Sequence, residues 1–262
     1  MELRRRALEL LTLSDPEAKA QGTRALVEHL RSGCRPDPDA RLDEPAQLPG
    51  RPALPRLVAP SRLARRSAFT VEGRAALLHA LTHIEFNAIN LALDAVWRFA
   101  DMPEAYYLDW ARVASEEAHH FSLLAGHLSS LGHRYGDFDA HDGLWAMTGQ
   151  TRHDPTARMA LVPRTLEARG LDVTPAMRAR FAQAGDARAV EILDIVLRDE
   201  IGHVAIGNRW YRWLCERDGL DPIEHYDLLA SRHHAPVPRP PFNREARAAA
   251  GFTEAELERL AR

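Results

Sequence analysis

The chain has 262 residues and a mass of 29.4 kDa, which is enough for one large domain or two small ones. Hydrophobic residues make up 45% and charged residues 27%, as in ordinary globular proteins, and the net charge of −3 does not favour nucleic acid as a partner. No apolar run reaches about eighteen residues, so the sequence predicts no membrane span. The two cysteines, Cys34 and Cys215, exclude a disulfide scaffold and a zinc ribbon and fit a reducing cytoplasm.

Residues 1–33 are interpreted as an N-terminal helical segment. Apolar residues recur at helical spacing over residues 2–13 and again over 17–31, which predicts two amphipathic helices. The three arginines at positions 4 to 6 suit a solvated helix face better than an anion-binding one.

Two proline-rich segments flank the centre of the chain. Residues 34–69 are expected to form an extended linker, because seven prolines fall between positions 34 and 60 and no periodicity is sustained there. Residues 218–262 form a C-terminal extension, which is again extended over 235–245 and ends in a short helix capped by Thr253.

The central part, residues 70–217, has the apolar periodicity of long helices. About 22 irregular residues, ending near Pro155, separate the first two of these helices from the rest. No segment alternates with period two for long enough to be a strand, so the fold class is all-α, and the order of elements predicts a four-helix bundle with one long crossover. Long helices are expected over 70–99, 104–131, 155–169 and 186–217, and a short one over 174–184.

Several acidic and histidine side chains fall on the apolar stripes of these helices. Glu85 has apolar neighbours three, four and seven positions away in both directions, which places its carboxylate in the core. The next helix contains two overlapping Glu-x-x-His pairs. Glu117 and His120 share an apolar stripe, whereas Glu116 and His119 share a more polar one, so the first pair is the better candidate.

The second half of the bundle repeats this pattern. Glu200 and His203 form a second core-facing Glu-x-x-His pair, and Glu167 is the carboxylate of the preceding helix. Positions 85 and 117 are 32 residues apart and positions 167 and 200 are 33 apart, as expected of a structural repeat.

This set of side chains suits a pair of metal ions. Glu and His three positions apart lie on one helix face, about 5–6 Å apart at their bases, so both can reach one ion. Four carboxylates would neutralise two divalent cations, and oxygen-rich ligation with one imidazole per ion suits iron or manganese better than zinc. A purely structural network of salt bridges, with Arg164 and Arg198 as partners, would leave the carboxylates poorly compensated.

The order Glu85, Glu117-x-x-His120, Glu167, Glu200-x-x-His203 resembles the ferritin-like superfamily of di-iron and di-manganese carboxylate proteins. The chain looks like a bacterial ferritin-like family of uncharacterised function, over residues 70–215 and into the Pro-Pro-Phe-Asn tail at 240–243. The resemblance implies two iron ions, or iron and manganese, held by these six residues.

The residues that precede the second and fourth ligand carboxylates are also acidic. Metal-bound histidines usually donate their other N–H to a carboxylate, which fixes the tautomer. By the two-fold repeat we expect crossed pairs, Asp199 with His120 and Glu116 with His203, as related ferritin-like oxygenases show.

The other histidines are interpreted as structural, surface or turn residues. His79 and His83 point away from the direction of Glu85 and are taken as structural or surface residues. The His-Asp pairs at 141–142 and 153–154 lie in turns, and no phosphate-binding or dinucleotide motif occurs.

The leading functional hypothesis is therefore a cytoplasmic dinuclear iron protein that activates dioxygen as an oxidase or hydroxylase. It would need an external electron donor or electrons from its substrate, and the sequence specifies neither the substrate nor the oligomeric state. Iron storage and a bundle scaffold with a vestigial site are the alternatives. Long segments outside the bundle disfavour storage, and an intact set of six ligands disfavours the scaffold.

Overall fold

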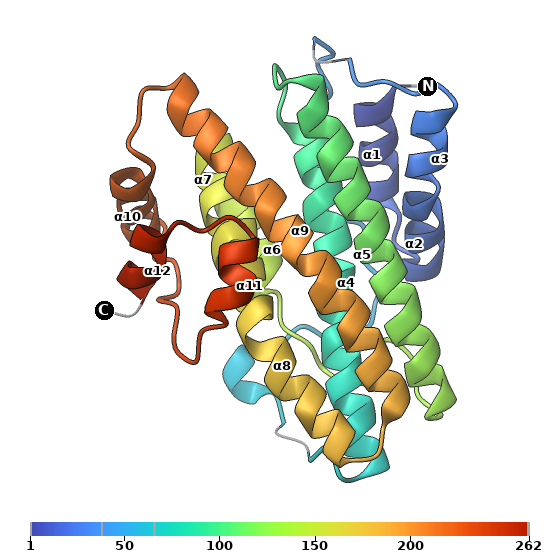
Figure 1. Cartoon of the computed structure of the whole chain (residues 1–262). Helices are drawn as coiled ribbons and strands as arrows, with labels where there is room; N and C mark the ends of the chain where they lie inside the picture. Colours follow the sequence, from blue (N-terminus) through green and yellow to red (C-terminus); the bar gives the residue numbers. More distant parts are fainter. Residues whose placement is uncertain (1, 38, 65–66, 261–262) are drawn as a thin grey trace. The chain divides into compact units, whose positions relative to one another are not determined.

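The computed structural model describes residues 2–37, 39–64 and 67–260. Helices are the regular elements throughout these ranges and none of their residues belongs to a strand, so the all-α prediction is confirmed (Figure 1). The chain divides into two compact units, Met1–Trp145 and Ala146–Arg262, and the dividing point falls inside one short helix. The boundaries predicted at residues 33, 69 and 217 remain predictions.

The first unit is organised around a pair of long antiparallel helices, α4 and α5, which a five-residue connection joins (Figure 1). Helix α4 begins where Thr70 accepts a hydrogen bond from the Gly73 N–H at 3.0 Å. Helix α1 packs on α4, and α2 packs on α5. The helical bounds in this unit are α1 Leu3–Thr12, α2 Pro16–Arg24, α3 Leu26–Arg31, η1 Pro60–Arg62, α4 Val71–Arg98 and α5 Glu104–Ser130.

The expected solvated face of α1 is wrong for Arg4. Its side chain is buried and donates to the carbonyl oxygens of Trp97 at 2.8 Å and of Ala40 at 2.7 Å. These carbonyls accept from the guanidinium, so the cation anchors α1 and the following segment to the end of α4. Arg5, in contrast, is exposed as expected.

Lys19, the only lysine of the chain, belongs to α2 and its side chain is fully buried. Its ammonium donates to the carbonyls of Leu11 and Gly50 and to Oδ1 of Asn90, at 3.1, 2.8 and 2.5 Å. Burial, followed by the positive charge of Arg51, lowers the pKa of Lys19 from 10.5 to about 7. One side chain thus connects α2, the proline-rich segment and α4.

This lowered pKa makes the stability of the protein depend on pH above neutrality. The unfolded chain keeps the lysine proton up to about pH 10.5, while the folded chain loses it near 7, so the free energy of unfolding should rise with pH between these values. We expect wild type to gain about 2 kcal/mol relative to Lys19→Met between pH 7.5 and 9.5, measured by urea unfolding. A difference that stays constant over this range would contradict the pKa.

The second unit contains a long kinked helical run, α7, η2 and α8, which packs along α9 (Figure 1). Asp154 caps α7 by accepting from Ala157 N, and Asp186 caps α9 by accepting from Ala189 N. Helix α6, Gly143–Gln150, precedes this run and contains the dividing point of the units. The remaining bounds are α7 Pro155–Leu161, η2 Val162–Glu167, α8 Ala168–Gln183, α9 Ala187–Arg217, α10 Pro222–Arg232, α11 Arg244–Ala249 and α12 Glu254–Leu260.

Several predicted helix ends differ from the structure. Gly170 was expected to end a helix, but α8 continues through it and through Pro175 to Gln183. The helix persists because Leu171 and Phe181 are fully buried, which outweighs the cost of about 1 kcal/mol of an interior glycine. Residues 17–31 form two helices, the irregular crossover contains α6, and the C-terminal extension contains α10 and α11, which the sequence did not predict.

The six residues of η2 form a π-helical turn, which sequence periodicity did not predict. Pro163 lacks the N–H that an α-helix needs, and Thr165 Oγ1 donates at 2.8 Å to the carbonyl of Ala160, five residues earlier. Gly207 on α9 leaves room for the ring of Pro163, because a Cβ atom at position 207 would lie 2.5 Å from the Cβ of Pro163. The glycine therefore lets η2 lie directly against α9.

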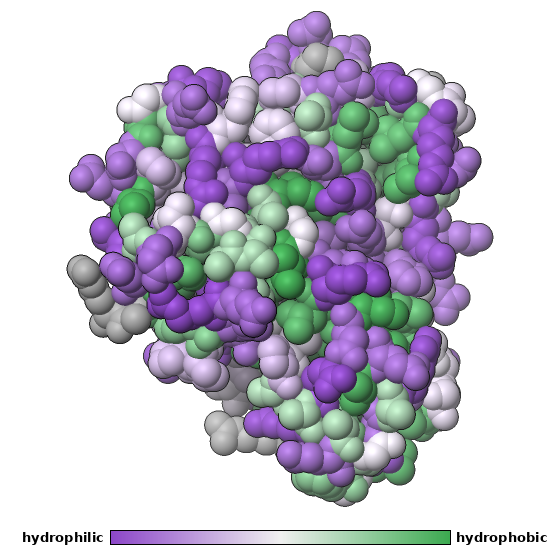
Figure 2. All heavy atoms as spheres, viewed as in Figure 1, coloured by the Kyte–Doolittle hydropathy of each residue, from purple (hydrophilic) through white to green (hydrophobic). Residues whose placement is uncertain are grey.

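None of the helices in the described part of the chain is long and apolar enough to cross a membrane. Cys34 and Cys215 are both buried, and neither forms a disulfide bond. The face shown in Figure 2 carries many hydrophilic side chains with smaller apolar groups among them.

Candidate metal centre

In the first unit, two carboxylates and one imidazole meet between α4 and α5. The Nδ1 atom of His120 lies 3.3 Å from Oε2 of Glu85 and 3.5 Å from Oε2 of Glu117. Each of the three residues offers a ligand atom within 4.8 Å of those of the other two. Their exposed fractions are 4% for Glu85, 1% for Glu117 and 0% for His120, so the group is closed to bulk water.

Helix geometry brings these residues together. Glu117 and His120 are three positions apart, so they lie on the same face of α5. Glu85 reaches them from α4, whose centre is almost wholly buried from Phe86 to Trp97. Phe86 and Phe121, the residues that follow Glu85 and His120 in the chain, pack against each other with ring centroids 5.8 Å apart.

The electrostatics of this group favour a cation. The pKa of Glu85 lies well above its usual value, first because burial disfavours the carboxylate and then because Glu117 adds a second negative charge. Hydrogen bonding and charge from His120 oppose this rise without cancelling it. A positive ion among these atoms would offset both effects by stabilising the ionised carboxylates, so the three residues could hold a metal ion.

The second unit contains a matching arrangement on α9. Nδ1 of His203 lies 3.6 Å from Oε1 of Glu200, and the side chains are 0% and 11% exposed. Glu167, the third predicted ligand of this half, is the last residue of η2, and η2 packs on α9. The π-turn therefore determines where this partly buried carboxylate lies.

The alternative Glu-x-x-His register lies closer to solvent. Glu116 is 37% exposed, with Oε1 3.7 Å from Nε of Arg112, and His119 is only partly buried. Asp199 is 18% exposed and lies 2.8 Å from Nε of Arg198. The crossed pairing of Asp199 with His120 and of Glu116 with His203 stays a prediction.

The arginines of the salt-bridge alternative have other partners. Arg164 donates to Oδ1 of Asn208 and to Oε1 of Glu256, both at 2.6 Å. Arg198 pairs with its neighbour Asp199. Glu85, Glu117 and His120 themselves offer two carboxylates and an imidazole, which is a set of metal-binding groups.

His79, His83 and His141 each have a hydrogen-bond partner within the protein. His79 and His83 are buried, and burial lowers the pKa of each to about 4. His79 Nε2 accepts from Gly136 N at 2.9 Å, and His83 Nδ1 lies 2.8 Å from the Tyr135 hydroxyl. In the predicted turns, His141 Nδ1 accepts from Gly143 N at 3.2 Å.

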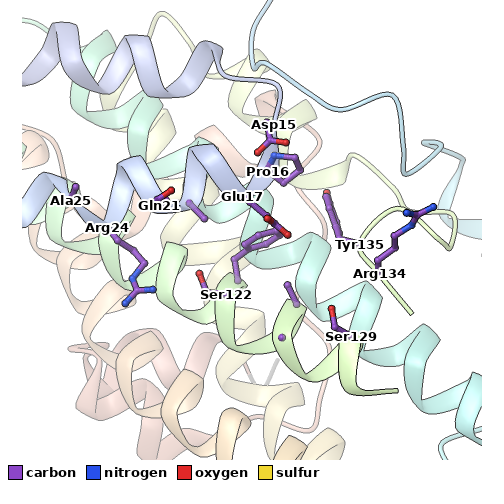
Figure 3. A pocket seen from close by; sticks show the side chains of 14 residues that line it. Asp15, Pro16, Glu17, Gln21, Arg24, Ala25, Ser122, Ser129, Arg134 and Tyr135 are labelled. Carbon is purple, nitrogen blue, oxygen red and sulfur yellow. The ribbon is translucent and has the colours of Figure 1, made fainter. Parts of the chain in front are cut away.

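A groove of about 750 Å³ follows α2 and α5 on another side of α5 (Figure 3). Glu17 and Arg24 line it from α2, Ser122 from α5, and Arg134 and Tyr135 from the following loop. None of the three candidate ligands lines this groove, so it is a separate feature of the first unit.

Comparison with known proteins places the chain in a family. The family described as "Protein of unknown function (DUF455)" matches residues 12–258. An "Uncharacterized protein" of Haemophilus influenzae (strain ATCC 51907 / DSM 11121 / KW20 / Rd) is 52% identical over 214 residues, covering 79% of this chain and 74% of that protein. The chain belongs to the DUF455 family. No solved structure matches it.

The buried geometry generates a prediction about the register of α5. Glu117→Ala and His120→Ala should each abolish tight metal binding, because each removes one of three clustered ligand atoms. His119→Ala, one position away and partly exposed, is the matched control and should leave the metal content unchanged. The measurement is metal per chain after purification and dialysis. Metal loss in the His119 variant with retention in the His120 variant would reverse the assignment.

A second prediction joins the centre to stability. In the metal-free protein the raised pKa of Glu85 means that the unfolded chain releases this proton first, so stability falls as pH rises from about 4.5 towards the raised pKa. A metal that binds only the folded chain adds stability by mass action. Chelation should therefore lower the melting temperature, and by more at pH 8 than at pH 6. An unchanged melting temperature at pH 8 after complete metal removal would show that protein groups already satisfy the carboxylates.

Proposed function

We propose that the two Glu-x-x-His pairs and the two additional glutamates act together as a dinuclear metal centre in a ferritin-like four-helix bundle. The observation that carries this proposal is the buried group of Glu85, Glu117 and His120, in which two carboxylates and one imidazole offer closely spaced ligand atoms for a cation. The repeated pair Glu200 and His203 supports a second, equivalent half-site.

The proposed metals are two iron ions, or one iron and one manganese. The donors are carboxylate oxygens with one imidazole in each half, and this oxygen-rich set suits iron or manganese better than zinc. Glu85, Glu117 and His120 would hold one side of the centre, and Glu167, Glu200 and His203 the other.

We propose an oxygen-activating oxidase or hydroxylase as the activity. When bound, the metal pair would supply electrons to dioxygen, a reaction that protein side chains alone do not perform. The side chains around it would exclude water, since Glu117 and His120 are at most 1% exposed. An external electron donor would restore the reduced centre, and the buried free cysteines support the expected cytoplasmic location.

The acidic residues beside the ligands have a positioning role in this proposal. A carboxylate that accepts the second N–H of a metal-bound imidazole fixes its tautomer and its ring orientation. Asp199 and Glu116 would serve His120 and His203 in this way. Asp199 is 18% exposed and Glu116 is 37% exposed, and each lies next in the chain to a candidate ligand glutamate.

Metal and oxygen stoichiometry test the proposal. Purified protein should contain about two metal ions per chain, and the anaerobically reduced protein should consume dioxygen on mixing with a return of the oxidised absorption spectrum. Glu117→Ala should abolish oxygen consumption, whereas His119→Ala should keep it. Iron uptake far beyond two ions per chain, with mineral formation, would indicate storage instead. Metal-free protein with an unchanged fold and no affinity for iron would leave a scaffold as the function.

A further inference from the structure

A cavity of about 820 Å³ lies within the second unit, and none of the candidate ligands lines it. Arg164 and Thr165 of η2 form one side of it, Tyr226 of α10 another, and Phe252 precedes α12 on a third. The extended segment from Val237 to Phe242 runs along its edge. Its volume lies within the range of pockets that bind small organic molecules.

Arg164 is the first polar group of this cavity. Its side chain is only 4% exposed, and Nη1 and Nη2 donate to Asn208 and Glu256 at 2.6 Å. The guanidinium carbon lies 5.1, 5.3 and 4.8 Å from the ring centroids of Tyr211, Tyr226 and Phe252. Its Nε–H is buried and has no acceptor among the residues that the structure describes. An unsatisfied buried donor of this kind costs about 1–3 kcal/mol.

Arg247 is the second. It is 2% exposed, and Nε and Nη2 donate to the two carboxylate oxygens of Asp172 at 2.9 and 2.7 Å. These bonds do not use Nη1. The guanidinium carbon of Arg247 lies 5.2 Å from the ring centroid of Phe252. Arg164 and Arg247 therefore both contact this one aromatic ring.

The charges around the cavity do not balance. Glu256 contacts Arg164 at 2.6 Å and Arg212 at 2.8 Å. Asp172 contacts Arg247 at 2.7 Å and Arg169 at 3.6 Å. Four guanidinium groups thus share two carboxylates, while Arg259 has its own partner in Asp227. Among the residues that line the cavity, three arginines face two acidic residues, and this surplus of one positive charge favours an anion there.

The other walls are apolar and flat. Phe242, Phe252 and Val237 line the cavity together with two prolines of the same extended segment. Thr165 Oγ1 donates to the carbonyl of Ala160, so the Tyr226 hydroxyl, 2.9 Å away, must be the donor to Thr165. The tyrosine ring is thereby held in place with its hydroxyl proton already used.

We propose that this cavity binds a small molecule that combines a flat apolar body with a carboxylate. The positive charge of Arg164 and of the other arginines that line the cavity would attract the carboxylate and favour its ionised form. The apolar body would lie among Phe242, Phe252 and Val237. This site involves the second unit alone and does not depend on the proposed metal centre.

The probe for this proposal is 2-naphthoate, and its neutral isostere 2-naphthamide is the matched ligand control. Binding is measured by saturation-transfer NMR and calorimetry on the full chain after chelation, because a carboxylate could otherwise bind the metals. Naphthoate should bind at least about tenfold more tightly than naphthamide, since only the anion satisfies the arginine surplus. Equal affinities of the two, or no binding of naphthoate at about 5 mM, would overturn the proposal.

A pair of charge variants tests the location without disturbing the core. Val237 is 80% exposed and lines the cavity, so Val237→Glu should weaken naphthoate binding about threefold and Val237→Lys should strengthen it by a similar factor. Leu228 is 50% exposed on α10 and does not line the cavity, so the same two substitutions there should have no effect. Equal responses at both positions would show that net charge, and not this cavity, governs binding.

Arg164→Gln removes the buried positive charge and so tests its contribution directly. It should reduce naphthoate affinity at least about tenfold and leave naphthamide affinity nearly unchanged. Circular dichroism reports whether this buried substitution folds, and the Val237 pair gives a decisive result if it does not. A folded Arg164→Gln protein with unchanged preference for the anion would contradict the role of Arg164.

Discussion

The cost of burying negative charge is the constraint on which the rest of this structure depends. Glu85 and Glu117 lie at 4% and 1% exposure within hydrogen-bonding reach of one imidazole, and an isolated carboxylate in such surroundings costs several kcal/mol. The packing of the helices around these two side chains must therefore offset this free-energy cost. Helices α1 and α2 pack on α4 and α5 and hold them in place through Arg4 and Lys19, whose charges are satisfied mainly by carbonyl oxygens.

The second unit also buries charged side chains, and it stabilises them through different contacts. Glu200 and His203 are held on α9, while the position of Glu167 follows from a π-turn that Pro163 starts and Gly207 accommodates. Buried arginines in this unit lie against aromatic rings and share carboxylates, as Arg164 does with Glu256. Burial raises the pKa of Glu256, and Arg164, the Thr253 N–H and Arg212 lower it by more, so that pKa lies below its usual value. Positive charge predominates at this cavity, whereas negative charge predominates at the candidate metal centre.

The sequence predicted the elements whose patterns are long and regular. Helix α4, α5 and α9 follow from apolar periodicity, and their caps at Thr70 and Asp186 are residues that accept hydrogen bonds from free N–H groups. The core-facing positions of Glu117 and His120 followed from the same periodicity. Periodicity identifies these positions because α5 has one buried face, and the polar candidate residues interrupt its apolar pattern.

Other features depend on contacts that no local pattern encodes. Gly170 and Pro175 are usual helix breakers, yet α8 passes through both because its apolar face is buried along α9. The burial of Arg4 requires the carbonyls of Trp97 and Ala40, which are distant in sequence. Similarly, the cavity around Arg164 is assembled from η2, α10 and the C-terminal residues, so its chemistry is visible only in three dimensions.

Anomalous X-ray scattering from crystals of the iron-loaded protein, recorded on both sides of the iron absorption edge, tests the central claim most directly. The account predicts two iron peaks, with Glu85, Glu117 and His120 bound on one side and Glu167, Glu200 and His203 on the other. Crystals that contain no iron peak at these residues, with arginine side chains or ordered water between the carboxylates, would contradict it.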